Sequence, residues 1–143
     1  MRTISIRSAE ERDTEAILEL WREAQATPSR TDSFEDLVNL IRSHPGSALV
    51  ATEHGRLVGS IIAGWDGWRG HIYRLAVLPV DRRRGIGTLL MAAAEKSLEA
   101  KGARRISILV EREDDQAVEF WRSLSPDGLE LDARMIRFIK DIE

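Results

Sequence analysis

Residues 75–88 read LAVLPVDRRRGIGT and combine the end of an apolar strand, a basic turn and the start of a helix. The first N–H groups of a helix have no partner within the helix, and the helix dipole is positive there. Gly85 and Gly87 lack a Cβ, so the backbone can approach a bulky anion closely. The arginines at positions 82–84 add guanidinium groups that suit phosphate oxygens. This stretch therefore predicts an anion site, and a diphosphate is the natural ligand.

Two familiar nucleotide motifs do not fit this turn. A P-loop requires Gly-Lys-Ser/Thr, whereas Gly87 is followed directly by Thr88 and no lysine is near. A dinucleotide fingerprint requires a third glycine three residues after the second, and that position is Leu90. The remaining alternative is an arginine-rich turn whose glycines serve only tight packing.

Apolar periodicity on both sides of this stretch predicts helices and strands in alternation. Short connections between the strands 48–52, 57–65 and 71–78 indicate an antiparallel meander. The expected fold class is α/β (α+β), a mixed, mostly antiparallel central sheet flanked by helices in the order β-α-α-β-β-β-α-β-α-β-β. The other predicted strands cover residues 3–7, 105–110, 129–131 and 135–139, and the predicted helices begin near residues 13, 31, 85 and 114.

Length and composition limit the class of protein. A chain of 143 residues suggests a single domain, 1–143. The absence of cysteine excludes a disulfide scaffold, a thiolate-zinc site and a cysteine nucleophile, and we expect no metal and a reducing, cytoplasmic setting. The net charge of −3 gives no reason to expect a nucleic acid or an anionic membrane as partner. The apolar runs are far shorter than the ~20 residues that span a bilayer.

The motif Arg82-x-x-Gly85-x-Gly87, after a strand that ends in Val77-x-Pro79, resembles the acetyl-CoA signature of the GNAT superfamily of N-acetyltransferases. That signature is Arg/Gln-x-x-Gly-x-Gly/Ala after Val-x-Pro. The expected order of elements is also similar to that family, so the resemblance covers nearly the whole chain. The turn that begins at residue 65 is similar to the corresponding turn in small bacterial members of this superfamily. The resemblance implies an acyltransferase, more narrowly an N-acetyltransferase, that uses acetyl-CoA (coenzyme A) as co-substrate.

The resemblance also implies where the co-substrate binds. The backbone of the fourth strand is expected to pair with the pantetheine arm, which enters a gap between the fourth and fifth strands. The N–H groups of the basic turn are expected to hold the pyrophosphate, and the helix near residue 114 is expected to flank it. The implied binding residues are Leu75, Ala76, Val77, Arg82, Arg83, Arg84, Gly85, Ile86, Gly87, Thr88, Asp114, Ala117, Phe120 and Trp121.

Three positions depart from the family pattern. Asp114 stands where the family has Asn, and an ionised carboxylate accepts but does not donate hydrogen bonds. Trp121 replaces a Tyr that often protonates the leaving thiolate, and an indole is a donor without acid function. Leu109 stands where ribosomal-protein N-terminal acetyltransferases carry Glu, so protein N-terminal acetylation by that mechanism is not expected.

The chemistry that follows is attack of an amine on an acetyl thioester. Direct transfer in a ternary complex is expected, because without cysteine there is no acetyl-cysteine route. Tyr73 is the first candidate for a polar group facing the substrate, because it shares a strand face with Leu75. His71 is expected to be exposed, and Asp66 is expected to cap the turn before this strand. The candidate catalytic residues are Tyr73, Glu111 and Trp121.

The acceptor is expected to be a small-molecule amine or a lysine side chain. A different class of function is an acyl-CoA-binding module without catalysis, and Trp121 in place of Tyr keeps that alternative open. The predicted pair of C-terminal strands offers an edge for a homodimer.

Overall fold

The computed structural model describes residues 3–142 of the chain. These residues form two compact units, and the chain divides between Ile108 and Leu109.

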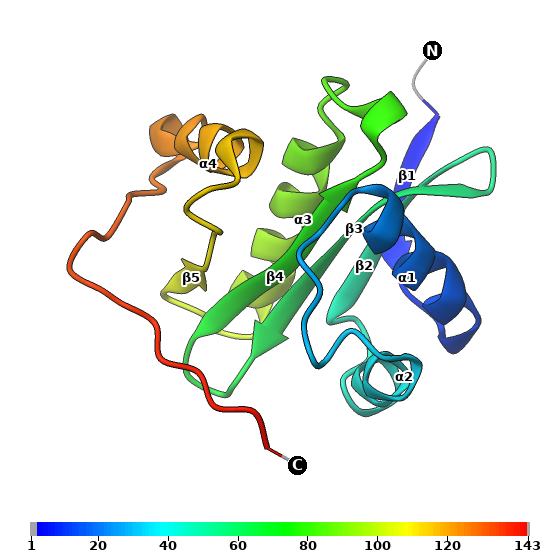
Figure 1. Cartoon of the computed structure of the whole chain (residues 1–143), viewed down its shortest axis with the longest axis horizontal. Coiled ribbons are helices and arrows are strands. Elements are labelled where there is room, and N and C mark those ends of the chain that lie inside the picture. The colour runs from blue at the N-terminus through cyan, green and yellow to red at the C-terminus, as the bar shows by residue number, and fades with distance from the viewer. Residues whose placement is uncertain (1–2, 143) are drawn as a thin grey trace. The chain divides into compact units, whose positions relative to one another are not determined.

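The first unit is built on a mixed sheet whose strands lie side by side in chain order (Figure 1). All neighbouring pairs are antiparallel except the last, in which β5 runs parallel to β4. The sheet class expected from the sequence is thereby confirmed. Its strands among the described residues are β1 (Ile4–Ser8), β2 (Ala48–Glu53), β3 (Arg56–Trp65), β4 (Gly70–Val77) and β5 (Ile106–Ile108).

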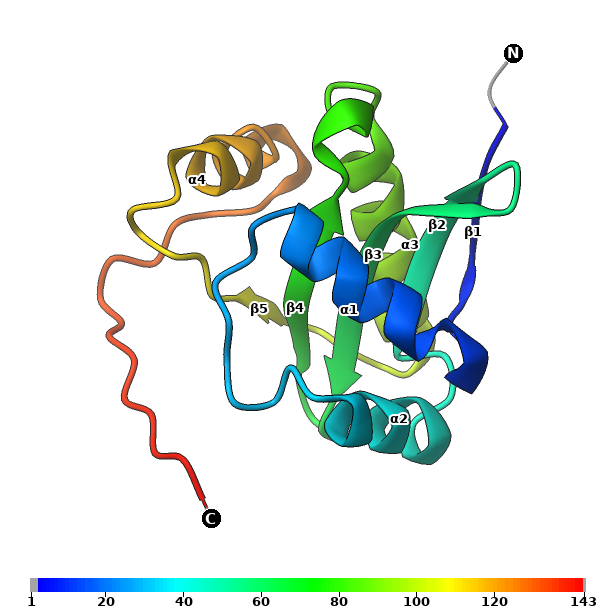
Figure 2. The same cartoon turned by 45° about the vertical axis from the view of Figure 1, so that its right-hand side comes forward.

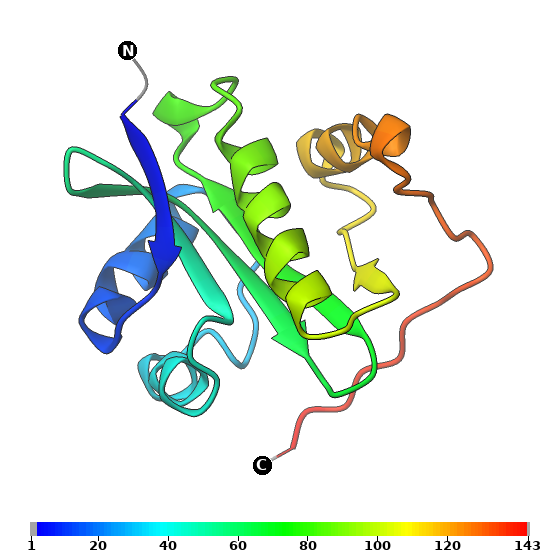
Figure 3. The ribbon, with the colours of Figure 1, turned by 180° about the vertical axis from the view of Figure 1, so that it is seen from behind.

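Helices cover both faces of this sheet, as Figures 1 and 2 show from two directions. Helices α1 (Thr14–Glu23) and α2 (Phe34–Ser43) lie on one face, and α3 (Ile86–Ala100) lies on the other, which Figure 3 shows from behind. The apolar stripe of α1 is buried, and Ser33 caps the start of α2, because its side chain accepts a hydrogen bond from the Asp36 N–H. The sequence periodicity predicted these three helices.

Two glycines allow α3 to lie close to the sheet. A Cβ on Gly59 in β3 would lie 3.0 Å from Leu90 Cδ1 and 3.1 Å from the Ala76 carbonyl oxygen. A Cβ on Gly70, at the start of β4, would lie 2.7 Å from Leu98 Cδ1. Both ends of α3 are therefore packed directly onto the backbone of β3 and β4, which fixes the start of the helix beside the end of β4.

The second unit contains helix α4 (Asp115–Arg122) and a 3-10 turn, η3 (Ser125–Asp127). The prediction of strands over 129–131 and 135–139 is wrong, because these residues adopt no strand. Leu131 is 76% exposed and Phe138 is 87% exposed. An alternating apolar pattern forms a strand only when another strand pairs with it, and no strand lies among residues 109–142 to do so. The fifth strand is also shorter than the predicted range, 105–110.

Neither a membrane-spanning helix nor a cluster of metal-ligating side chains is found among residues 3–142. No helix there is long and apolar enough to cross a membrane. No group of three or more His, Cys, Asp or Glu side chains is arranged to hold a metal ion in that part of the chain.

Candidate functional site

Strand β4 is only partly paired on the edge that faces β5. The parallel pairing runs from Gly70 opposite Ile106 to Ile72 opposite Ile108 and then stops. On its other edge, β4 stays paired with β3 as far as Val77. Among residues 3–108, no strand pairs with residues 73–77 on the β5 side. The Val77 carbonyl accepts a hydrogen bond from Arg82 Nε, and the Arg74 carbonyl accepts one from the Ser60 hydroxyl. The other backbone N–H and C=O groups that face this side have no strand partner within residues 3–108 and can pair with an extended ligand, as the predicted gap between the fourth and fifth strands requires.

A β-bulge interrupts β4 just after its pairing with β5 ends at Ile72. Ser60 pairs with Ala76, but Ile62 pairs with Tyr73, so β4 has one residue more than β3 across this interval. Arg74 lies in the bulge with φ of +52°, in the left-handed region. Bulges bend a strand and re-aim its side chains. No sequence signal indicated this bulge, because arginine is not a residue typical of positive φ.

The Arg74 side chain ties the α1–α2 connection to the bulge. Its Nε donates to Asp32 Oδ1 at 3.1 Å, its Nη2 also bonds Asp32 Oδ2, and the same Nη2 donates to the Thr27 carbonyl at 2.7 Å. The guanidinium lies 5.5 Å from the ring centroid of Trp21, whose Nε1 donates to Ser60 Oγ. The Arg74 and Asp32 side chains are only 19% and 18% exposed. The loop between the first two helices is therefore held beside β4 at the point where its edge opens.

The basic turn follows β4 directly. After the short helix η2 (Pro79–Asp81), Arg83 and Gly85 have φ of +65° and +79°, and α3 begins at Ile86. Gly85 supplies the left-handed residue at the helix start, where its carbonyl accepts from the Leu89 N–H at 3.0 Å. The N–H groups of the first turn of α3 have no acceptor within the helix. The structure therefore brings the free edge of β4 and the N-terminus of α3 together, as the sequence predicted.

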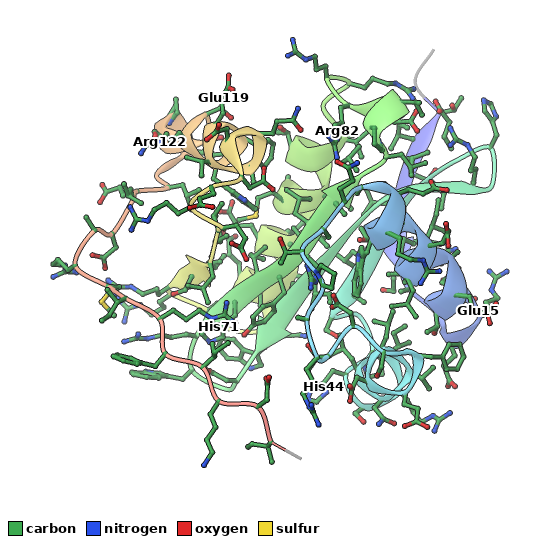
Figure 4. The ribbon with its side chains drawn as sticks, viewed as in Figure 1. Glu15, His44, His71, Arg82, Glu119 and Arg122 are labelled. Atoms are coloured by element: carbon green, nitrogen blue, oxygen red, sulfur yellow. The ribbon has the colours of Figure 1, made fainter. Side chains whose placement is uncertain are left out.

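Arg82 and Arg84 both brace this turn. Arg82 donates to the Val77 carbonyl at 3.3 Å and to the Ala24 carbonyl at 3.2 Å, which links the turn to the end of β4 and to α1 (Figure 4). Arg84 donates to Glu53 Oε2 at 2.6 Å and to Asp81 Oδ1 at 2.8 Å. In this structure its guanidinium is thus engaged by carboxylates. A hydrogen bond from Arg84 lowers the pKa of Glu53 from 4.5 to about 2.

This ion pair predicts acid sensitivity of the turn. Because the pKa of Glu53 is lower in the folded chain, its stabilising effect is complete above pH 4.5 and is lost as the pH falls toward about 2. We expect the urea midpoint of the protein to fall over that interval, and to fall less in Glu53→Gln. Glu19→Gln, which removes an exposed ion pair on α1, is the matched control and is expected to behave as wild type. Equal acid sensitivity of Glu53→Gln and wild type would contradict this assignment.

The opposite end of β4 carries a row of polar and aromatic side chains. His71 Nε2 lies 3.1 Å from Asp66 Oδ2, and the His71 and Tyr73 rings stack with centroids 6.2 Å apart. Asp66 also accepts the N–H groups of Trp68 and Arg69, and these bonds together with His71 lower its pKa to about 2. Asp66 therefore caps the turn as expected and in addition orients His71, a pairing that the sequence spacing did not reveal.

The remaining predicted residues belong to the second unit. Asp114 Oδ1 accepts from the Ala117 N–H at 3.1 Å and caps α4, so this carboxylate has a structural partner. The rings of Phe120 and Trp121 pack edge to face with centroids 5.0 Å apart. Glu111 accepts the Asp114 N–H through its carbonyl. The roles of these residues toward a co-substrate stay predictions.

Known proteins resemble this chain over most of its length. The sequence profile of the acetyltransferase (GNAT) family matches residues 14–125. An acetyltransferase of Pectobacterium atrosepticum is 31% identical over 140 residues, covering 98% of this chain and 99% of that protein.

Solved structures show the same fold. The PaiA N-acetyltransferase of Thermoplasma acidophilum, in complex with coenzyme A, has a TM-score of 0.75 at 24% identity and covers 85% of this chain and 88% of its own. The aminoglycoside acetyltransferase AAC(6')-Iy, with a bisubstrate analogue, has a TM-score of 0.77 at 20% identity and covers 99% and 100%. The family match and the open edge of β4 beside the glycine turn agree, and this chain belongs to the acetyltransferase (GNAT) family as an N-acetyltransferase.

Proposed function

We propose that this protein transfers the acetyl group of acetyl-CoA directly to a primary amine in a ternary complex. The observation that carries the proposal is the free β4 edge over residues 73–77, which leads into the glycine turn at the start of α3. We further propose that residues 1–143 act as one domain, since the family match, 14–125, spans both units; residues 1, 2 and 143 lie outside the described part.

We propose that residues of the first unit bind the co-substrate. We propose that the backbone of Leu75, Ala76 and Val77 pairs with the pantetheine arm as an added strand would. The backbone N–H groups of residues 83–88 are proposed to face the pyrophosphate, with the left-handed Gly85 leaving room for it, whereas the N–H of Arg82, which the sequence also suggested, donates to the Pro79 carbonyl. The braces from Arg82 and Arg84 support this role by holding the turn in shape. Asp114, Ala117, Phe120 and Trp121 are proposed to line the other flank.

The reaction needs little beyond positioning, because a thioester is already activated. Holding the amine against the carbonyl carbon provides most of the rate gain. We propose that a backbone N–H near Val77 polarises the thioester carbonyl and stabilises the developing oxyanion. The sulfur leaves as a thiolate, which we propose Trp121 stabilises through its indole N–H.

A proton must also leave the attacking ammonium group. We propose that this proton passes through a chain of water molecules to His71, which lies at the other end of β4 from Val77, roughly 20 Å away along the strand, with Tyr73 facing the substrate and Glu111 as a further relay. When the His71 Nε2–H donates to Asp66, the other ring nitrogen, Nδ1, carries the lone pair that accepts a proton. The Asp66 carboxylate then stabilises the imidazolium that forms.

The acceptor is proposed to be a small-molecule amine or a lysine side chain that approaches from the side of the α1–α2 connection. The contacts of Arg74 with Asp32 and Thr27, which hold that connection beside the open edge, support this direction of entry. A homodimer and a cytoplasmic location stay predictions.

The experiment is free-thiol release from acetyl-CoA with a panel of amines: a linear polyamine, an aminoglycoside, free lysine and a lysine-containing peptide. We expect at least one amine to raise thiol release well above the rate of hydrolysis, with mass spectrometry showing an acetylated product. Coenzyme A binding without any amine-dependent release across a broad panel would instead support the acyl-CoA-binding module.

A further inference from the structure

A basic hollow lies at the end of the first unit remote from the glycine turn. Its volume is about 630 Å³, and its walls come from the β3–β4 turn and from the connection between α3 and β5, which run past each other in Figure 3. The side chains that matter here are Trp65, Trp68, Arg69, Lys101, Arg104 and Arg105. The hollow adjoins the C-terminus of α3, a helix of 15 residues and so about 22 Å long, whereas the turn precedes its N-terminus. It is a separate site.

The charge of the hollow is positive although the chain as a whole has a net charge of −3. Four cationic side chains line it, and no carboxylate does. The elements that form the hollow carry opposing groups in Asp66 of the β3–β4 turn, in Glu99 of the last turn of α3, and in the helix end, which is equivalent to about half a negative charge. Together these do not cancel four cations, so the hollow attracts an anion.

The walls of the hollow are fixed by hydrogen bonds. Asp66 Oδ1 accepts from the Trp68 N–H at 2.8 Å and from the Arg69 N–H at 2.7 Å, which holds the β3–β4 turn. The Gly70 N–H donates to the Arg105 carbonyl at 3.0 Å and ties this turn to the α3–β5 connection. A ligand therefore needs to order few backbone groups on binding.

An exposed tryptophan completes the hollow. The Trp68 side chain is 71% exposed, and the Arg69 guanidinium lies 4.0 Å from its ring centroid. A cation stacked on one face of an indole leaves the opposite face for a second planar group. Bases stack on aromatic side chains in just this way, while guanidinium groups bind phosphate oxygens in a forked geometry.

We infer that the basic hollow binds a nucleoside phosphate, with the base against Trp68 and the phosphates against Arg104, Arg105 and Lys101. The volume is within the range of roughly 300–1,000 Å³ typical of small-ligand sites. This site requires neither acetyl transfer nor the glycine turn, so it stands apart from the function proposed above.

The test is calorimetric titration of AMP, ADP and ATP, with inorganic phosphate as the comparison ligand. The double variant Arg104→Glu/Arg105→Glu and the single variant Trp68→Ala are each expected to weaken nucleotide binding at least tenfold. Arg12→Glu/Arg22→Glu, which changes the net charge equally on a different surface, is the matched control and is expected to bind as wild type. Circular dichroism checks that each variant is folded. If the double variant is unfolded, Trp68→Ala still tests the site, because the Trp68 side chain is exposed and its loss is not expected to unfold the protein.

The Gly85→Trp variant separates the two sites. Nucleotide binding that persists in Gly85→Trp and is lost in the hollow variants supports the inference. Four results overturn it: no nucleotide binding at millimolar concentration, phosphate binding as tight as that of ATP, binding lost in Gly85→Trp, or binding to single-stranded oligonucleotides alone.

Discussion

Gly85→Trp is expected to weaken coenzyme A binding at least about 100-fold while the protein stays folded. Gly85 starts α3 in the left-handed conformation, with φ of +79°, and lies among the N–H groups proposed to face the pyrophosphate. An indole at this position occupies the space that a diphosphate needs. A calorimetric coenzyme A titration measures the affinity, and a thermal unfolding curve checks that the variant is folded.

Backbone strain must be separated from the loss of the site. Gly55, in the β2–β3 hairpin, has φ of +78°, and a Cβ there would meet nothing within 4 Å. Gly55→Trp therefore carries the same conformational cost, roughly 1–2 kcal/mol, without blocking the turn before α3. We expect Gly55→Trp to bind coenzyme A as wild type does. Normal coenzyme A binding by Gly85→Trp would show that the pyrophosphate lies elsewhere.

Replacing His71 is expected to lower kcat by about 10²–10⁴ with little change in coenzyme A affinity, because general base catalysis contributes on that order. The measurement uses His71→Gln and the amine that the panel identifies. Asp66→Asn is expected to lower kcat less, since it removes the charge that orients His71 but leaves the ring in place.

Tyr73→Phe distinguishes the two candidates on β4. Its ring still stacks on His71, and only the hydroxyl is lost. If Tyr73 only faces the substrate, Tyr73→Phe changes KM more than kcat. A full kcat loss in Tyr73→Phe together with near-normal kcat in His71→Gln would assign the proton transfer to Tyr73 instead.

The β4–turn–α3 core of the site could be predicted because each part has a local cause. Alternation marks β4, Pro79 ends it, and glycine at residue 85 permits the left-handed start of α3. The predicted C-terminal strands failed for the opposite reason. Alternation over 135–139 shows only which residues share a face, and a strand also needs a partner that no local pattern specifies.

Two features of the site came only from tertiary structure. The bulge at Arg74 depends on how β4 aligns with β3, and its side chain then meets Asp32, 42 residues earlier in the chain. The engagement of Arg84 by Glu53 is similar, since the arginine triplet by itself indicated phosphate contacts. Charge in a sequence shows what a side chain can bind, and the surrounding fold selects the partner.

By itself, the sequence determined the succession of elements through β5 and α4, the place of the glycine turn, and the absence of cysteine chemistry. Periodicity and the backbone freedom of glycine act over a few neighbouring residues, and composition does not depend on the order of the residues at all. Only the tertiary structure decided that the edge of β4 opens after Ile72, that Asp66 orients His71, and that cations from two separate connections line one hollow. These depend on contacts between distant parts of the chain, and such contacts leave no local pattern in the sequence.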